Sequence, residues 1–247
     1  MAQKPADITD VTDDTRQESE LATVPTTPFQ LGTIAGDTSP GDIRLPRLQL
    51  VHGVGSLSEM FHPGDVVLGG DNLLVEKGQP LDMIVLSARQ YWKEYCGAGK
   101  YDPNHRPATY LTEEEVIAAG GTTRWENGIG PTFNRAMTLT LLIKQPKDVV
   151  CGLFGINLKD DVYAPAVWDV DKSAYRRVAP QVLTAAQFGL RARGLLSGLF
   201  QLVTKSEKIN GNNTIVPAFK LIGHNDDEVI AAIRELFSGT PNHQPQG

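Results

Sequence analysis

Turn-forming residues interrupt this chain at short intervals, and their spacing limits what it can fold into more than any other feature. Glycine occurs 24 times and proline 16 times in 247 residues, and they separate short runs rich in aliphatic and β-branched side chains. Glycine and proline favour turns and weaken helix interiors, whereas β-branched side chains suit strands. The pattern predicts a mainly β fold with a minor helical part, which is an α+β domain.

Several runs have strand character, and five or so of them form the predicted core. Residues 66–80 contain short β-prone runs, split at 69–72 and 77–78, that fit a hairpin or meander, and the main candidates are 48–52, 81–95, 136–146 and 149–159. The run 81–95 is the longest, and the last two are separated by a turn at 145–148. A further hairpin is predicted between 200 and 223, because Asn210-Gly211 is a strong signal for a two-residue turn.

Three helices are predicted among these strands. Thr112 and Glu115 form a capping box before a short helix that Gly120 ends. A second helix is expected over 180–200, with Pro180 at its start. The third lies within 225–239, where apolar residues recur at helical spacing.

The two ends of the chain differ from its middle. Residues 1–40 hold seven acids against Lys4 and Arg16, a net charge of -5, and have no apolar periodicity. Such a segment cannot bury enough surface to offset the entropy of ordering, so we expect a disordered acidic N-terminal tail. The polar residues 240–247 are expected to be a disordered C-terminus. Residues 41–239 then form a single β-rich domain.

Positive charge gathers late in the chain. Between 171 and 220, eight lysines and arginines face only Asp171 and Glu207, a net charge of +6, although the whole chain has a net charge of -6. This segment could meet a polyanion.

Signals for catalysis, cofactors and membranes are not found. The two cysteines are not in a CxxC pair, which favours a reducing compartment, and the histidines lack ligand spacing. No nucleophile elbow or phosphate-binding loop occurs, and no run reaches the roughly 20 apolar residues that span a bilayer. We expect a non-enzymatic protein without cofactor, metal or membrane partner, located in a cytoplasm, or in the host cytoplasm if a phage encodes it.

The most suggestive stretch lies at the end of the longest strand candidate. Alternation would place Arg89, Tyr91, Lys93 and Tyr95 on one face, and we add the neighbouring Trp92 to the candidate set. Single-stranded nucleic acid is held by this combination of rings and cations. An ordinary half-exposed strand can carry the same side chains, and we weigh that reading equally.

Other candidates lie outside this strand. Trp125, in a glycine-rich loop, is either a stacking residue or an anchor folded onto the core, and the anchor is slightly favoured. Four arginines of the basic segment complete the set: Arg176, Arg177, Arg191 and Arg193. A solvated surface explains them as well as a ligand does.

Short motifs resemble a group of bacteriophage proteins related to single-stranded DNA-binding proteins. They are Leu45-Pro46-Arg47-Leu48-Gln49-Leu50, Pro63-Gly64-Asp65, Tyr91-Trp92, Phe200-Gln201-Leu202 and Val216-Pro217-Ala218-Phe219. The resemblance covers roughly 43–222. It implies an OB-like, five-stranded, partly open barrel with appended helices, whose face and loops hold an oligonucleotide. The acidic segment lies at the N-terminus here, unlike the C-terminal acidic tip of better-known single-strand binders.

Three functional hypotheses follow. The first is a non-catalytic single-stranded DNA-binding protein of phage replication or recombination, with other proteins of those processes as partners and a homo-oligomer left open. Its acidic tail would compete with DNA for the DNA-binding surface. The second is a phage virion structural or accessory protein whose N-terminal tail is a flexible assembly arm. The third is a metal-dependent nuclease that uses acids among Asp160, Asp161, Asp169 and Asp171.

Overall fold

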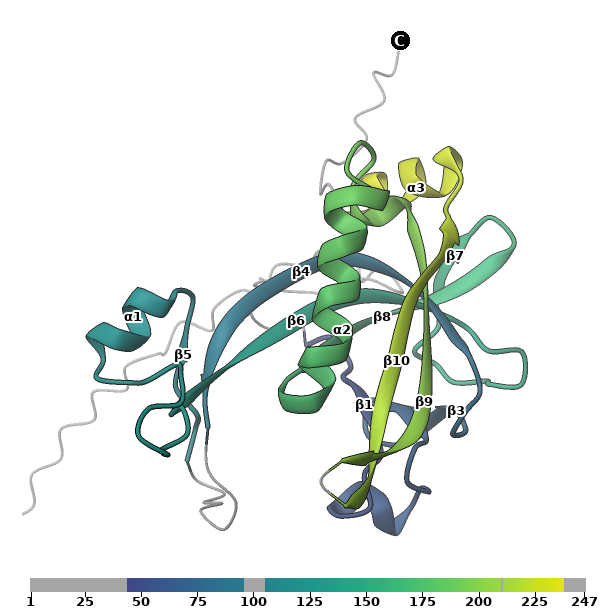
Figure 1. The fold of residues 1–247 in the computed structure, drawn as a ribbon. Helices are drawn as coiled ribbons and strands as arrows, with labels where there is room; N and C mark the ends of the chain where they lie inside the picture. The colour runs from purple at the N-terminus through teal and green to yellow at the C-terminus, as the bar shows by residue number, and fades with distance from the viewer. Residues whose placement is uncertain (1–43, 96–104, 210, 238–247) are drawn as a thin grey trace, which may run out of the picture. The chain divides into compact units, whose positions relative to one another are not determined.

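The computed structural model describes residues 44–95, 105–209 and 211–237 (Figure 1). The tails predicted for 1–40 and 240–247 lie outside these described residues. Strands make up most of the regular structure and a few helices accompany them, so the prediction of a mainly β, α+β protein is confirmed.

Seven antiparallel strands form the main sheet. Its order is β10-β9-β4-β6-β8-β7, and the short β5 pairs with the end of β4. The strands are β4 (Leu81–Glu94), β5 (Thr109–Tyr110), β6 (Phe133–Lys144), β7 (Ile156–Leu158), β8 (Asp161–Val170), β9 (Gly198–Ile209) and β10 (Asn212–His224). Among the described residues no pairing joins β10 to β7, so this sheet is an open path and not a closed ring.

A smaller sheet of three strands packs beside the main one. It consists of β1 (Leu48–Leu50), β2 (Val66–Leu68) and β3 (Asn72–Val75), and the 3-10 helix η1 (Ser56–Glu59) lies between β1 and β2. The buried Asp65 accepts backbone hydrogen bonds from His62 at 2.9 Å and Lys77 at 3.2 Å. Thr204 of β9 donates to the carbonyl oxygen of Gly64, which ties the two sheets together.

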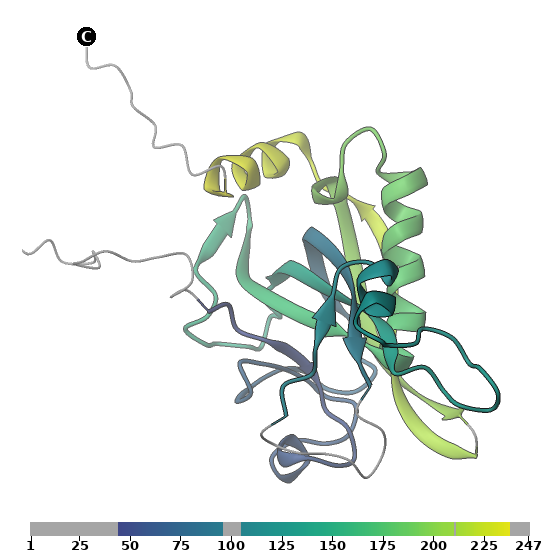
Figure 2. The same cartoon turned by 90° about the vertical axis from the view of Figure 1, so that its left-hand side faces the viewer.

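The helices lie on different parts of the main sheet. They are α1 (Glu113–Ala118), α2 (Lys172–Thr184) with its π-helical continuation η2 (Ala185–Gly189), the 3-10 turn η3 (Leu195–Ser197) and α3 (Asp227–Phe237). In Figures 1 and 2, α2 runs beside β10. Figure 1 shows α1 and β5 at the far ends of β4 and β6 from α3.

Local signals predicted some elements correctly. Thr112 and Glu115 form the expected capping box, and Gly120, with φ 78°, follows the end of α1. The hairpin of β9 and β10 turns where Asn-Gly was expected, and Gly211 there has φ 84°. The terminal helix also forms, with Ile230 and Ile233 buried.

Other boundaries were predicted wrongly. The helix expected at 180–200 begins at Lys172 and contains Pro180, because Val178, Ala179 and Val182 pack into the core and outweigh the roughly 3 kcal/mol cost of an internal proline. The strand expected at 149–159 is only β7, and β8 was missed. Pro165 lies inside β8, but β7 pairs with β8 only at residues 161–163. The missing N–H of the proline therefore breaks no hydrogen bond to β7.

The main sheet buries both faces, but to different extents. One face, which we call the core face, packs Met83, Val85 and Leu139 against α2 and the small sheet. The opposite face packs Ile84 and Leu142 against α3 through Ile233. This second cluster covers only one end of the strands, and no described helix packs on the rest of that face.

Candidate nucleic-acid interface

A β-bulge decides which side chains of β4 face outward. Val85 lies opposite Leu141, but Ser87 lies opposite Thr140, so Leu86 is an extra residue in the ladder. Without it, strict alternation would place Ser87 and the odd-numbered residues after it on the core face with Val85. With the bulge they lie on the opposite face.

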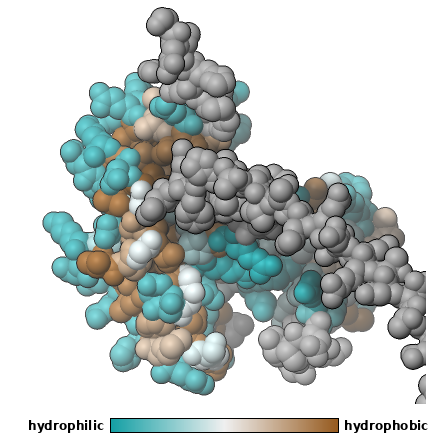
Figure 3. Space-filling view, turned by 180° about the vertical axis from the view of Figure 1, so that it is seen from behind, coloured by the Kyte–Doolittle hydropathy of each residue, from teal (hydrophilic) through white to brown (hydrophobic). Residues whose placement is uncertain are grey.

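The outward residues form a polar surface, which we call the polar face. On β4 it comprises Ser87, Arg89, Tyr91 and Lys93, and on β6 it comprises Thr140, Thr138 and Asn134. The residue opposite Tyr91, Ala136, is buried. The prediction that Arg89, Tyr91 and Lys93 share one side is confirmed. Figure 3, seen from behind Figure 1, shows hydrophilic side chains where the middle of the molecule is visible.

Arg89 supplies an unpaired positive charge to the described part of this surface. Its side chain is exposed, and within the described residues it has no ion-pair partner. Together with Tyr91 and Thr138 it lines a pocket of about 330 Å³, which Thr109, Tyr110 and Leu111 close from the side of β5. An aromatic ring and a positive charge therefore line the same pocket, an arrangement that can bind an unpaired base together with its phosphate.

Lys93 is held by an acid. Its Nζ lies 2.8 Å from Asp171, just before α2. Burial lowers the pKa of Lys93, but the hydrogen bond and the charge of Asp171 outweigh it, so the pKa is raised above the usual lysine value. Lys93 stays protonated at neutral pH, and much of its charge is compensated.

Tyr95 continues this surface past the end of β4. It is 43% exposed, and the ammonium group of Lys172 lies 5.5 Å from the centre of its ring. Its backbone N–H donates to the carbonyl oxygen of Thr132 at 2.7 Å, which fixes it at the foot of the 122–132 loop. Lys172 has φ 50° and begins α2.

Thr138 and Arg47, which were not candidate site residues, also belong to this surface. Thr138 donates to Asp169 at 2.6 Å, and the guanidinium of Arg47 lies 4.0 Å from the same carboxylate. Arg47 reaches the sheet through a parallel bridge to Val167. No local sequence signal could have found this arrangement, since it depends on pairing between distant segments.

Trp92 does not belong to the polar face. It is only 9% exposed and packs with Val116 and Phe133 beneath α1, while the guanidinium of Arg135 lies 5.0 Å from its ring. Trp92 follows Tyr91 directly, so alternation turns it to the other side of β4. Its inclusion in the candidate set was wrong.

Trp125 is not a core anchor. Its side chain is 74% exposed in the loop between α1 and β6, so the favoured reading was wrong. The structure places it apart from the pocket beside Arg89, whose lining does not include it.

The four arginines of the basic segment do not join the polar face. Arg176 and Arg177 belong to α2, which packs on the core face, so they come from the other side of the sheet. Arg177 pairs with Glu207. Arg191 and Arg193 lie in the turn after η2, not in the helix predicted for them.

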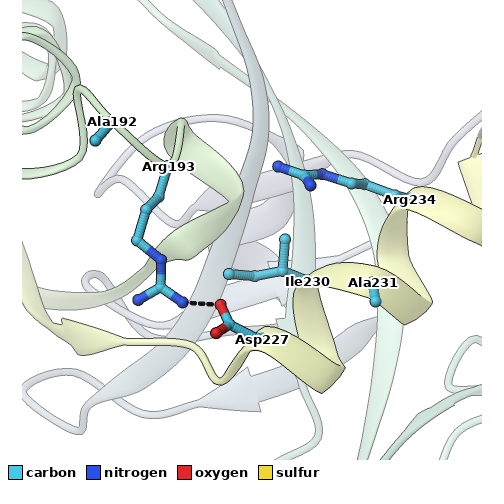
Figure 4. A pocket seen from close by; sticks show the side chains of 6 residues that line it. All are labelled: Ala192, Arg193, Asp227, Ile230, Ala231 and Arg234. Carbon is cyan, nitrogen blue, oxygen red and sulfur yellow. Dashed lines mark hydrogen bonds and ion pairs between the residues drawn. The ribbon is translucent and has the colours of Figure 1, made fainter.

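Arg193 lines a second pocket. It pairs with Asp227 of α3, and the two side chains line a pocket of about 310 Å³ together with Ile230 and Arg234 (Figure 4). This pocket is formed by α3 and the turn before η3. The structure thus places Arg89, Tyr91, Lys93 and Tyr95 on one surface, and the two tryptophans and the four arginines elsewhere.

The acids considered for a metal site are mostly paired with cations. Asp161 lies 2.7 Å from Lys144, and Asp171 contacts Lys93. Asp169 accepts from Thr138. In the part of the chain that the structure describes, no group of three or more histidine, cysteine or acidic side chains is placed to hold a metal ion.

None of the family models, curated proteins or solved structures compared with the chain matches it. Within residues 44–95, 105–209 and 211–237, no helix combines the length and apolar character needed to cross a membrane.

Proposed function

We propose that this chain is a non-catalytic single-stranded DNA-binding protein that acts in phage replication or recombination. One observation carries the proposal: Arg89 and Tyr91 border the same open pocket on an exposed sheet face. Tyr91 offers a ring on which an unpaired base can stack, and Arg89 offers an uncompensated charge for the phosphate.

The shape of the surface supports a single strand over a duplex. In a duplex the bases are stacked on each other, so a partly buried tyrosine such as Tyr91 could not reach their faces. A single strand can turn individual bases toward the sheet while its phosphates follow Arg89 and Lys172.

The biological setting rests on the resemblance of residues 43–222 to phage single-strand binders. An OB-like architecture, a cytoplasmic location and partners in replication or recombination belong to the same proposal. The open strand path from β10 to β7 is compatible with a partly open barrel, whose closure would need contacts other than strand pairing.

The test is titration of labelled oligo(dT) and of duplex DNA with the full-length protein at several salt concentrations. Tyr91→Ala should weaken oligo(dT) binding about 5- to 150-fold, as expected for loss of one stacked base. Arg89→Ala should weaken binding and lower the slope of log K against log salt by about 0.7.

The matched control is Arg176→Ala. Arg176 is also exposed and carries the same charge, but it lies on the other side of the sheet. It should change oligo(dT) affinity much less than Arg89→Ala. Absence of binding by the wild-type protein, binding without salt dependence, or equal effects of the two arginine variants would contradict the proposal.

A virion structural or accessory protein is the second candidate, and β10 favours it. Its 13 residues form one end of the main sheet, and no described strand pairs with its outer side. Such an edge can accept a strand from another chain. Association with phage particles without affinity for oligo(dT) would select this function.

A further inference from the structure

The loop after α1 ends in a tight hairpin whose tip presents two large apolar side chains to solvent. Glu126 and Ile129 exchange backbone hydrogen bonds of 3.0 and 2.8 Å, and Asn127 and Gly128 between them have φ values of 51° and 79°. These are the left-handed conformations that a two-residue hairpin turn requires. Trp125 is 74% exposed and Ile129 is 72% exposed. The closed backbone holds both side chains outward.

The ring of Trp125 is supported on one side. A Cβ atom added to Gly130 would lie 3.4 Å from the ring, so the indole lies against the backbone of this glycine. The rest of its surface is open to solvent. A large aromatic ring with one supported side and one open side is a platform on which another flat ring can stack.

The base of this loop lies at the end of the polar face. Tyr95 donates its backbone N–H to Thr132, and Thr132 and Thr122 close the base of the loop with hydrogen bonds of 2.8 and 3.1 Å. From Arg89 of β4 to Tyr95 just past its end, six residue steps span roughly 20 Å. A strand bound along the polar face would therefore leave it at the foot of this loop.

The charges near the tip favour a base over a phosphate. The guanidinium of Arg124 lies 3.7 Å from Glu113, so its charge is partly compensated. The exposed Glu126 adds a carboxylate at the turn itself. Such a tip attracts phosphate weakly, whereas stacking on Trp125 needs no charge.

We infer that Trp125, flanked by Ile129, is a stacking site for an unpaired base, located beyond the end of the polar face. It lengthens the stretch of single strand that the protein covers. The inference rests on the proposed function, because it extends the same binding surface.

The experiment measures affinity for oligo(dT) of increasing length, from about 4 to about 16 nucleotides, with the full-length protein at constant salt. Trp125→Ala should leave the shortest oligonucleotides unaffected and weaken the longer ones about 5- to 150-fold. Trp125→Phe should retain most of the affinity, since a ring remains. Phe188→Ala is the matched control, because Phe188 is a 79% exposed aromatic in η2, which continues α2.

Native fluorescence gives a second measurement, because Trp92 and Trp168 are buried and Trp125 is exposed. Quenching by long oligo(dT) should occur in the wild type and disappear in Trp125→Phe. Equal affinity of wild type and Trp125→Ala at every length, an equal loss at every length, or quenching that persists in Trp125→Phe would overturn the inference and leave the proposed function standing. Failure of the wild type to bind at any length would remove the proposed function itself.

Discussion

The two halves of β4 lie on one strand but have opposite surroundings on the face away from α2. In the first half, Ile84 is fully buried against Ile233 of α3. In the second half, Arg89 and Tyr91 border an open pocket. The neighbouring β6 repeats the division, with Leu142 beneath α3 and Thr138 in the open part. One sheet face is therefore a packed core at one end and an exposed, pocketed surface at the other.

The two halves should differ most in their contribution to stability. Leu142→Ala in the covered half should lower the free energy of unfolding by about 2–5 kcal/mol, because it opens a cavity beneath α3. Ser87→Ala in the open half should change it by less than about 1 kcal/mol, since its hydrogen bond to Thr140 is exposed. Urea unfolding measures both. Similar losses for the two variants would show that the halves are not distinct.

A smaller effect is expected on binding within the open half. Asp171→Asn removes the acid that compensates Lys93, and asparagine remains a good residue at the start of a helix. Affinity for oligo(dT) should rise on the order of 2- to 5-fold, with a steeper salt dependence. An unchanged or weaker affinity would mean that Lys93 does not face the bound strand.

The smallest effect concerns the end of β4. The carboxylate of Glu94 accepts a backbone hydrogen bond from Ala108 and contacts His105, each at 3.0 Å, and these contacts lower the pKa of Glu94. A folded-state pKa below the unfolded value gives stability that is present above the unfolded value and lost as pH falls through the folded one.

Glu94→Gln should therefore be less stable than wild type at neutral pH. The difference should shrink as the pH falls below about 4.3, the usual value for glutamate. Thermal unfolding at a series of pH values measures it. A difference that stays constant across this range would contradict the linkage.

Elements with strong local signals could be predicted from the sequence. Thr112 and Glu115 cap α1 within four residues, and Gly211 turns the β9–β10 hairpin. Arg89, Tyr91 and Lys93 share a side because alternation within one strand is also local. These predictions needed no knowledge of distant contacts.

Features that depend on tertiary contacts could not be predicted. The start of α2 is decided by the burial of Val178 and Val182 in the core, and β8 tolerates Pro165 because β7 is short. Trp125 is different, because its exposure follows from a local signal that was missed: Asn127 and Gly128 close the hairpin beside it.

The extra residue at Leu86 also bears on how the free and bound states of this surface compare. A bulge increases local twist and bends its strand, and β4 is strongly curved in Figure 1. Its polar half projects beyond the part of the sheet that α3 covers. Within the described residues no helix covers Arg89, so the backbone of this part of the sheet should superimpose closely in the free and bound states.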